Sequence, residues 1–580
     1  MSGICGYVGN AHPDVLERML DAIDYRGDGK EVATAEGVGL GYRWWTRRPG
    51  KSPGIYKEGP HLVAVAGTFA PPLDNPAKSL MRRISPNIDD SLDGAFAGAW
   101  WDGQKKRLTL IRDPFGIRSL YHANHQGVFY FASELKQLLA IPGIPAEPDF
   151  VALHKYLTFS FVPGDAVPIK GIHRLLAGNS AILEDGKLGI ALYFNLEERI
   201  DPQFEDQKIA AEVIGTSWRE AVAKRLNGES EVGLFLSGGI DSAGVAYFLK
   251  RLGVKTRAFT LDFGERSVEK EQAECVAKKL EIPLTHVRVN GSDLSPILMD
   301  LVWKLDLPFG DAVTGPQYLL CKAAREASLS AVFNGEGGDQ FFGGWTNKPM
   351  ISAQLFGDLY GEESSEELYL RSYHKFYGLE EPLYSAFFKD QVGGPGTRRA
   401  HLKPYLQHEG VSTFLNRVRL ADISLKGSQN ILPRAERISN AWGLDARVPL
   451  FDRALAEASF RLPTQLKLKG ACEKFVLKLV LQNKLPPEIV WRRKYGMNVP
   501  ITDWVLGPMR QQMGELLGLD SLKRRGYFKP EYVQNLLEGR NDPHETRKRR
   551  IGEKVWALAM LEAWLRVFVD GRGKKPGGAT

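Results

Sequence analysis

Residues 237–242 read Ser-Gly-Gly-Ile-Asp-Ser and join one apolar segment, 231–236, to another, 243–252. The first segment has the length and composition of a buried strand, and the second those of a helix. Glycines let a backbone turn its N–H groups inward, and the following helix adds the positive end of its dipole, so the loop can bind phosphate or pyrophosphate. Asp241 places a carboxylate beside this anion site, which predicts a divalent cation between the carboxylate and the phosphates.

Two further segments carry residue types that suit the same chemistry. Residues 333–344 again end a strand in a glycine-rich turn, and this turn contains Glu336 and Asp339. Residues 491–500 form a glycine-containing basic loop that includes Lys494. Asp339 can share the cation of the first loop, and a lysine over a departing pyrophosphate offsets the charge that builds up in the transition state. The three segments together predict a site from which pyrophosphate leaves.

The elements that must position these loops differ between two parts of the chain. Residues 1 to about 195 contain short apolar segments broken by Gly and Pro, which predict an α+β sandwich. Its strands are expected at 3–8, 37–44, 61–66, 94–101, 107–112, 119–122, 127–132 and 179–183, with helices at 13–23 and 135–140.

From residue 207 onward, predicted strands alternate with helices, which indicates an α/β fold with a parallel sheet and a ligand at the carboxyl ends of its strands. The chain beyond residue 352 is expected to be mainly helical. The strands of the parallel sheet are expected at 231–236, 256–262, 284–289 and 330–334.

Composition excludes several classes of protein. The 580 residues are 43% hydrophobic and 25% charged, as in ordinary globular domains. The net charge of +7 is mild, and the basic runs at 547–550 and 572–575 are interpreted as solvated surface, so no nucleic-acid partner is expected. The 4 cysteines are scattered and give no metal site. No signal or membrane-spanning segment is visible, so we expect a cytoplasmic protein without a membrane contact.

With these motifs in this order, the chain resembles the asparagine synthetase and β-lactam synthetase superfamily over nearly its whole length. The resemblance implies an N-terminal class-II glutaminase domain, an Ntn-hydrolase-like αββα sandwich, followed by a synthetase domain of the ATP-pyrophosphatase (adenine nucleotide alpha hydrolase-like) type. The segments that carry it are the three loops above together with 112–118, 132–136 and 444–452. We expect the glutaminase-like domain at 1–195, the synthetase domain with its helical C-terminal part at 207–570, and a flexible tail at 571–580.

The resemblance also implies roles for individual residues of the synthetase half, with ATP and Mg²⁺ as cofactors. Glu336 matches the base that deprotonates the incoming amine, and it stands where β-lactam synthetases carry tyrosine. Lys494 matches the lysine that stabilises the pentavalent phosphate and the leaving pyrophosphate, and Asp241 and Asp339 match the Mg²⁺-binding acids. ATP and its pyrophosphate are expected to contact Phe235, Ser237, Gly238, Gly239, Asp241, Ser242, Leu261 and Gly335.

The glutaminase half departs from the family pattern at its chemical positions. The nucleophilic cysteine of the family falls at Ser2, and a hydroxyl is a much weaker nucleophile than a thiol near neutral pH. The arginine that clamps the glutamine carboxylate falls at Trp44, and the Asn-Gly oxyanion pair falls at Ala66 and Gly67. The acid that holds the glutamine amine lies in a segment, 72–91, that is shortened here. We therefore predict an inactive glutaminase domain.

Cys5 offers a rival nucleophile, because Cys-Gly-x-x-Gly also begins at this residue if the four preceding residues were removed. The other changes in the domain remain in either register. We favour the interpretation that Cys5 is a small buried hydrophobic residue on a strand.

A synthetase that has lost its ammonia supply must use another amine. We therefore expect an ATP-dependent, AMP-forming amide ligase that adenylates a small-molecule or peptide carboxylate. The leading hypothesis is macrolactam closure within a peptide, as in lasso-peptide cyclases, with a precursor peptide and its protease as partners. Two alternatives stay open: an asparagine synthetase-type enzyme that converts aspartate to asparagine with free ammonia, and a non-catalytic regulator that binds ATP.

Overall fold

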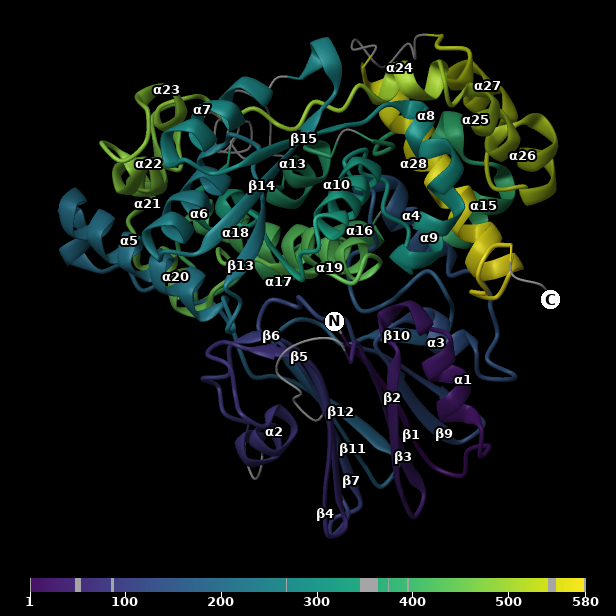
Figure 1. Ribbon diagram of the computed structural model, residues 1–580. Helices are drawn as coiled ribbons and strands as arrows, with labels where there is room; N and C mark the ends of the chain where they lie inside the picture. The colour runs from purple at the N-terminus through teal and green to yellow at the C-terminus, as the bar shows by residue number, and fades with distance from the viewer. Residues whose placement is uncertain are drawn as a thin grey trace.

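The computed structural model contains two antiparallel sheets in its N-terminal part and a parallel sheet in the remainder. In Figure 1 the antiparallel strands, coloured purple to blue, lie below the helices of the rest of the chain. The structure describes residues 2–46, 54–84, 88–267, 269–344, 364–373, 375–393, 396–540 and 549–577.

The antiparallel strands form two six-stranded sheets, with the orders β10-β8-β9-β1-β3-β2 and β12-β11-β7-β6-β5-β4. The strands are β1 (Ser2–Val8), β2 (Gly29–Ala35), β3 (Val38–Trp44), β4 (Ile55–Glu58), β5 (His61–Phe69), β6 (Gly94–Asp102), β7 (Arg107–Arg112), β8 (Tyr121–His125), β9 (Val128–Ala132), β10 (Ile172–Arg174), β11 (Asn179–Glu184) and β12 (Lys187–Leu192). The helices are α1 (Val15–Asp21), α2 (Pro76–Ile84), α3 (Leu135–Leu139) and α4 (Phe150–Phe159).

Alternation along the strands builds a four-layer sandwich. Successive strand residues face opposite sides, so Ile4 lies between the two sheets with Phe131, whereas Cys5 packs with Leu20 of α1 on the outer face. Leu80 of α2 packs on the outer face of the second sheet. The arrangement helix, sheet, sheet, helix is the αββα sandwich that was expected.

The parallel sheet has the order β15-β14-β13-β16-β17. Its order reverses at β13, because β14 lies on one side of this strand and β16 on the other. The loops after β13 and β16 therefore diverge and open a crevice at the carboxyl ends of the strands. The strands are β13 (Glu231–Phe235), β14 (Lys255–Asp262), β15 (Leu284–Arg288), β16 (Ala331–Phe333) and β17 (Asp445–Arg447), and the helices are α5 (Gln207–Lys224), α6 (Ile240–Arg251), α7 (Lys270–Leu280), α8 (Gly291–Leu294), α9 (Leu298–Leu305), α10 (Thr314–Glu326) and α11 (Gly338–Phe342).

The described chain beyond residue 364 is mainly helical, as expected, apart from β17 and a short hairpin of β18 (Leu468–Lys469) and β19 (Cys472–Glu473). A π-helix, η7 (Asp422–Ile431), joins α18 to α19. The helices are α13 (Ser365–Arg371), α14 (Glu380–Leu383), α15 (Ala386–Val392), α16 (Gly396–Ala400), α17 (Lys403–Leu406), α18 (Phe414–Ala421), α19 (Leu432–Asn440), α20 (Arg453–Arg461), α21 (Thr464–Lys467), α22 (Phe475–Leu481), α23 (Pro487–Val490), α24 (Ile501–Leu506), α25 (Arg510–Leu517), α26 (Leu519–Arg525), α27 (Pro530–Leu537), α28 (Arg549–Trp564) and the π-helix η8 (Leu565–Asp570).

Several elements were absent from the predictions. The elements missed include β2, β4, β10, β12, β17, α2 and α4. β12 is exposed along its whole length, although Leu188, Ile190 and Leu192 alternate with other residues in its sequence. The first residues of the expected tail make contacts, because the Trp303 indole N–H donates to the Gly573 carbonyl at 2.9 Å. Residues 547 and 548 of one basic run, and residues 578–580, lie outside the described residues.

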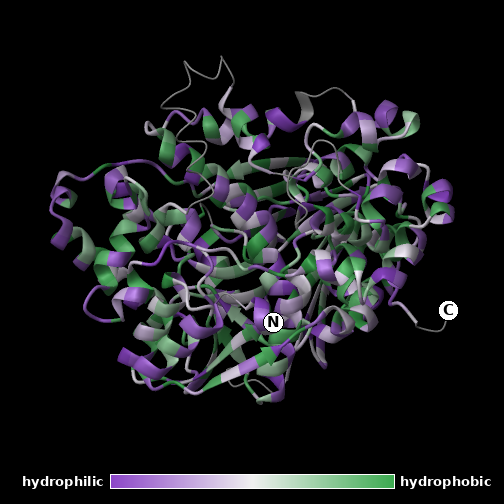
Figure 2. Ribbon diagram, turned by 90° about the horizontal axis from the view of Figure 1, so that it is seen from above, coloured by the Kyte–Doolittle hydropathy of each residue, from purple (hydrophilic) through white to green (hydrophobic). Residues whose placement is uncertain are grey.

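The surface and interior follow ordinary hydropathy. Figure 2 shows hydrophilic and hydrophobic residues alternating along the peripheral helices, as is typical of helices with one face on a core. Among the described residues, no helix combines the length and the apolar composition that crossing a membrane requires.

Candidate active site

The loop after β13 turns sharply at Gly238. Its φ of 70° is in the left-handed region, and a Cβ atom there would lie 2.5 Å from the side chain of Gln272, so glycine is required. Within the turn, the Gly239 N–H donates to the Ser237 hydroxyl at 3.3 Å. The Ser237 and Ser242 hydroxyl oxygens are 3.1 Å apart. The turn is thus held by its own side chains.

The loop after β16 packs closely against the start of α6. A Cβ atom on Gly335 would lie 2.5 Å from the Ser242 nitrogen, and one on Gly338 would lie 2.1 Å from Asp241 Oδ1. Glycines at both positions therefore allow the second loop to approach the first. Asp241 lies in the first turn of α6, which begins at Ile240 and so starts earlier than the sequence suggested.

Two lysines bind the carboxylates that these loops bring together. Lys474 Nζ lies 2.5 Å from Asp241 Oδ2 and 2.6 Å from Asp339 Oδ1, and Lys494 Nζ lies 3.4 Å from Asp339 Oδ2. The Lys474 side chain is only 1% exposed. Its φ of 52° is uncommon for a residue with a side chain, and backbone strain of this kind concentrates at functional sites.

The charges of this cluster reinforce one another. Burial disfavours the ionised Asp339 carboxylate, but Lys474 and Lys494 outweigh it and hold the pKa of Asp339 below its ordinary range. In turn, the Asp339 carboxylate raises the pKa of Lys494 although burial opposes this. Asp339 and Lys494 are therefore both charged at neutral pH.

These residues surround a cavity of about 220 Å³ at the carboxyl ends of β13, β14 and β16. Glu336 faces the same cavity, and its backbone N–H donates to Asn334 Oδ1 at 3.0 Å. Gly238 and Gly239, which were predicted to contact ATP, do not line the cavity, and Gly238 packs against Gln272 of α7 instead. The predicted residues that line the cavity are Phe235, Ser237, Asp241, Ser242, Leu261, Gly335, Glu336, Asp339 and Lys494.

Sequence reasoning missed three charged residues of this site, which are Lys474, Glu269 and Arg434. Lys474 lies 233 positions after Asp241 and belongs to no glycine-rich motif; the available signal was the apolar run 475–481, which predicts that the preceding lysine lies near a core. Glu269 lines the cavity, and burial raises its pKa to about 6. No role is predicted for it from the sequence, because it belongs to none of the three loop motifs.

Asp241 and Asp339 have the chemistry that a Mg²⁺ ion requires. Asp241 Oδ1 is buried without a hydrogen-bond partner, and carboxylate oxygens are the ligands that Mg²⁺ prefers. The described residues contain no cluster of three or more His, Cys, Asp or Glu placed to hold a metal ion. Magnesium in nucleotide sites is usually held by one or two carboxylates plus substrate phosphates, so the residues fit Mg²⁺ that binds together with ATP.

The predicted glutaminase positions also meet in space, but with different chemistry. Ser2 Oγ accepts a hydrogen bond of 3.1 Å from the Gly67 N–H, the donor that the resemblance assigns to the oxyanion. Trp44 lies opposite Ser2 in the β1–β3 register and stacks on Tyr42, with ring centroids 5.0 Å apart. Ala66 is buried and offers no polar side chain. An indole thus takes the place of the expected guanidinium.

Cys5 is fully buried, and burial raises the pKa of its thiol. This environment disfavours a thiolate and agrees with the interpretation of Cys5 as a hydrophobic residue. The segment 72–91, where the glutamine-binding acid was expected, contains α2, and its residues 85–87 lie outside the described part of the chain.

Comparison with known proteins assigns both halves. The asparagine synthase profile matches residues 216–566, and a glutamine amidotransferase domain profile matches residues 79–194. The chain belongs to the asparagine synthase family. Its two glycine-rich loops and the Lys494 loop all lie within the matched synthase region.

Relatives of this family member come from bacteria and fungi. Glutamine-hydrolysing asparagine synthetase 1 of Bacillus subtilis is 24% identical over 627 aligned positions, which cover 98% of each chain. A putative glutamine-hydrolysing asparagine synthetase of Mycobacterium tuberculosis is 28% identical over 83% of this chain and 77% of its own. The amidase chyE of Penicillium rubens is 24% identical over 79% of this chain and 77% of its own.

Membership makes the protein an asparagine synthetase-like, ATP-dependent, amide-forming enzyme, in a family of carbon–nitrogen ligases. The predicted family, fold class and ligase class are thereby confirmed. The roles of single residues, the use of Mg²⁺ and the inactivity of the glutaminase half stay predictions.

Replacement of Ser2 tests that inactivity. We expect the wild-type enzyme to release glutamate from glutamine only at background rate and Ser2→Ala to leave this rate unchanged, because the hydroxyl is bonded to Gly67 and Trp44 supplies no carboxylate clamp. A coupled glutamate dehydrogenase assay measures the release. Rapid release by the wild type that disappears in Ser2→Ala would contradict the prediction.

Proposed function

We propose that this family member is an AMP-forming amide ligase that joins a carboxylate to an amine not obtained from its own hydrolysis of glutamine. Macrolactam closure within a peptide is the leading form of this reaction. The observation that carries the proposal is a contrast between the two sites. Asp241, Asp339 and Lys494 keep a charged cluster on the cavity wall, whereas Ser2 lies beside the indole of Trp44 and is bonded to a backbone N–H.

The cavity residues supply each step of such a reaction. An oxygen of the substrate carboxylate attacks the α-phosphorus of ATP, and the bond from that phosphorus to pyrophosphate breaks. Lys494 neutralises charge on the departing pyrophosphate, which would lie against Ser237, Ser242 and the N-terminus of α6. Asp241 and Asp339 would hold Mg²⁺, which when bound supplies positive charge to the phosphates.

The second step forms the amide. The amine attacks the acyl carbon of the adenylate, and AMP leaves with the electron pair of the carbon–oxygen bond. Glu336 faces the cavity from the loop after β16 and accepts the proton that the amine loses. Its carboxylate lines the same cavity as Lys494 and so lies on the wall where the adenylate would form.

A second candidate is synthesis of asparagine from aspartate and free ammonia. The observation in its favour is that relatives which include one aligned over 98% of this chain are named asparagine synthetases. This reaction uses the same adenylation step and differs in the carboxylate and the amine.

One set of incubations separates these functions. Purified enzyme with Mg-ATP is given a panel of amino acids, peptides and small carboxylic acids, and ATP–pyrophosphate exchange is measured for each. Exchange with a peptide and loss of water from its mass support macrolactam closure. Asparagine formed from aspartate and ammonium in step with pyrophosphate supports the second candidate. Exchange with none of the acids would contradict both.

Glu336→Gln separates the two half-reactions. We expect ATP–pyrophosphate exchange to remain within about threefold of wild type, while amide formation falls by about 10²-fold or more, because the neutral amide keeps the shape of the side chain but cannot accept the proton. Exchange and product are measured on the same preparation. Glu271→Gln on the exposed surface of α7 is the control. Equal loss of both activities would assign Glu336 to adenylation instead.

A further inference from the structure

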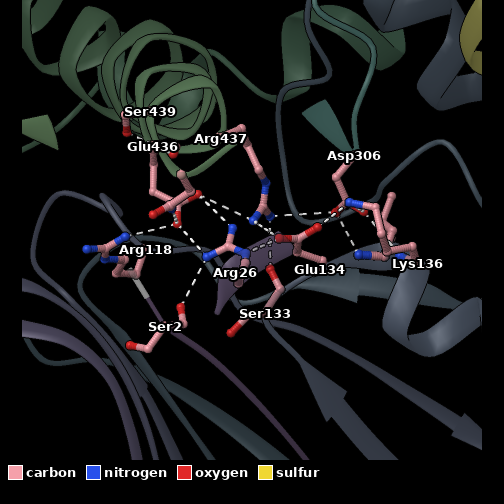
Figure 3. Close-up of polar contacts among 12 residues, drawn as sticks. Ser2, Arg26, Arg118, Ser133, Glu134, Lys136, Asp306, Glu436, Arg437 and Ser439 are labelled. Carbon is pink, nitrogen blue, oxygen red and sulfur yellow. Dashed lines mark hydrogen bonds and ion pairs between the residues drawn. The ribbon is translucent and has the colours of Figure 1, made fainter. Parts of the chain in front are cut away.

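Helix α19 lies between the two halves of the protein and presents a different face to each. Arg434, Ala435, Ile438 and Ser439 line the cavity. Glu436 and Arg437 instead reach side chains of the N-terminal half (Figure 3). Residues three or four apart lie on one face of a helix, so this division follows from the helical period.

Glu436 is held by two arginines of the N-terminal half. Arg26 forms a two-pronged pair with it, at 2.8 Å from Nη1 to Oε1 and 3.1 Å from Nη2 to Oε2. Arg118 Nη1 lies 3.0 Å from Glu436 Oε1, and its Nη2 lies 2.9 Å from Oδ1 of Asp445 at the start of β17. Paired arginine–carboxylate contacts fix direction as well as distance.

Arg437 makes the reciprocal contacts. Its Nη1 lies 3.1 Å from Glu134 Oε1, and its Nη2 donates to the Ser133 carbonyl at 2.9 Å. Glu134 also pairs with Arg26 and Lys136, so the contacts form one network (Figure 3). These charged side chains are between 0% and 4% exposed.

The physical character of this network indicates that it fixes the position of α19 more than it stabilises the fold. A buried ion pair gains little over well-packed apolar side chains, because desolvation offsets most of its attraction. Its geometry is strict, however, and an apolar contact of the same area would let a helix rotate or slide. Fixing Glu436 and Arg437 from one side therefore fixes Arg434, Ile438 and Ser439 on the other side of α19.

We propose that Arg26 and Glu134 are positioning residues of the ligase reaction, which act from the N-terminal half through α19 on the cavity wall. As far as the reaction is concerned, this inference rests on the proposed function. The phosphate-binding loops lead into other elements, α6 and α11, so we expect the affinity for ATP to change little when this network is broken. It gives the N-terminal half a task that needs no glutaminase chemistry.

Two variants on opposite sides of one contact test the proposal. Arg26→Met removes the guanidinium and keeps most of the side-chain volume, and Glu436→Gln removes the charge from α19 itself. Arg18→Met is the matched control, because Arg18 pairs with Asp14 in the same half at 50% exposure. Arg26→Lys is the conservative variant, which restores the charge without the two-pronged geometry.

Hydrogen exchange of the full-length protein gives the first measurement. We expect amides of 432–440 to exchange about tenfold faster in Arg26→Met and Glu436→Gln, with 231–251 unchanged and Arg18→Met like the wild type. In Arg26→Lys, the exchange rate of these amides should lie between those of the wild type and Arg26→Met. Unchanged exchange in 432–440, or an equal rise across all segments, would overturn the proposal. This measurement needs no substrate, so it remains decisive if the wild type catalyses no pyrophosphate exchange.

Kinetics give the second measurement. The affinity for Mg-ATP, measured by calorimetry, should stay within about twofold of wild type in Arg26→Met, because the phosphate loops are untouched. The rate of product formation at saturating ATP, with the acid identified in the exchange panel, should fall about tenfold and be partly rescued in Arg26→Lys. A parallel loss of ATP affinity would indicate general disruption and overturn a positioning role.

Discussion

Lys494→Ala is expected to lower the rate of ATP–pyrophosphate exchange by about 10²- to 10³-fold while the affinity for Mg-ATP stays within a few-fold of wild type. The ammonium lies 3.4 Å from Asp339 and lines the cavity. Its charge is needed most when pyrophosphate departs, and less when intact ATP binds to the Ser237 loop. The loop itself should survive, because Glu473 accepts the backbone N–H of Lys494 at 2.6 Å and alanine keeps this contact.

The exchange assay measures the loss of rate in Lys494→Ala, and calorimetry on the same preparation measures the affinity for Mg-ATP. Arg493→Ala is the matched control, because Arg493 is the exposed neighbour on the same loop and does not line the cavity. Lys494→Arg should recover only part of the rate, since a planar guanidinium cannot reproduce the point charge of an ammonium. A loss of ATP affinity as large as the loss of rate would make Lys494 a ground-state binding residue.

Asp339→Asn is expected to reduce exchange by about 100-fold and to raise the Mg²⁺ concentration at half-maximal rate by about tenfold or more. Asparagine has the same shape, so the backbone contact of the Asp339 carbonyl with the Gly344 N–H is preserved. What is lost is a carboxylate that lies 2.6 Å from Lys474. The substitution leaves Asp241 as the remaining acid of the pair, with both lysines close by.

A titration of exchange rate against Mg²⁺ at fixed ATP measures this effect. Asp300→Asn serves as the control, because Asp300 is a partly exposed acid on α9 that pairs with Lys304. Asp241→Asn should behave like Asp339→Asn if the two acids share one ion. An unchanged Mg²⁺ requirement in both variants would mean that neither carboxylate binds the metal.

Much of the fold was accessible from local patterns. The switch from short alternating strands to strand–helix alternation predicted the change from antiparallel sheets to a parallel sheet, because each pattern requires a different burial of strand faces. Other elements were missed by these patterns. The ten residues of α4 are mostly buried with no polar stripe, so this helix shows no period that a sequence pattern can detect. β12 was missed although Leu188, Ile190 and Leu192 alternate in its sequence, and none of its residues is buried.

The cavity loops were predictable for a similar reason. In residues 237–242 and 335–339 the glycines, acids and flanking strand lie within a few positions of one another, so their geometry is largely local. The structure added that Gly335 and Gly338 let the two loops touch. It also replaced the predicted loop position of Asp241 with the first turn of α6.

The sequence by itself determined the family, the two fold types and the cavity loops, because these depend on short segments whose glycines and hydrophobic periods act locally. Only the tertiary structure decided that Lys474 joins Asp241 to Asp339 and that Arg26 grips Glu436, 410 positions away. A buried charge is stable only beside a partner of opposite sign, and nothing in a local pattern specifies which distant residue will supply it. The partner is decided only when the N-terminal half packs against α19 of the other half.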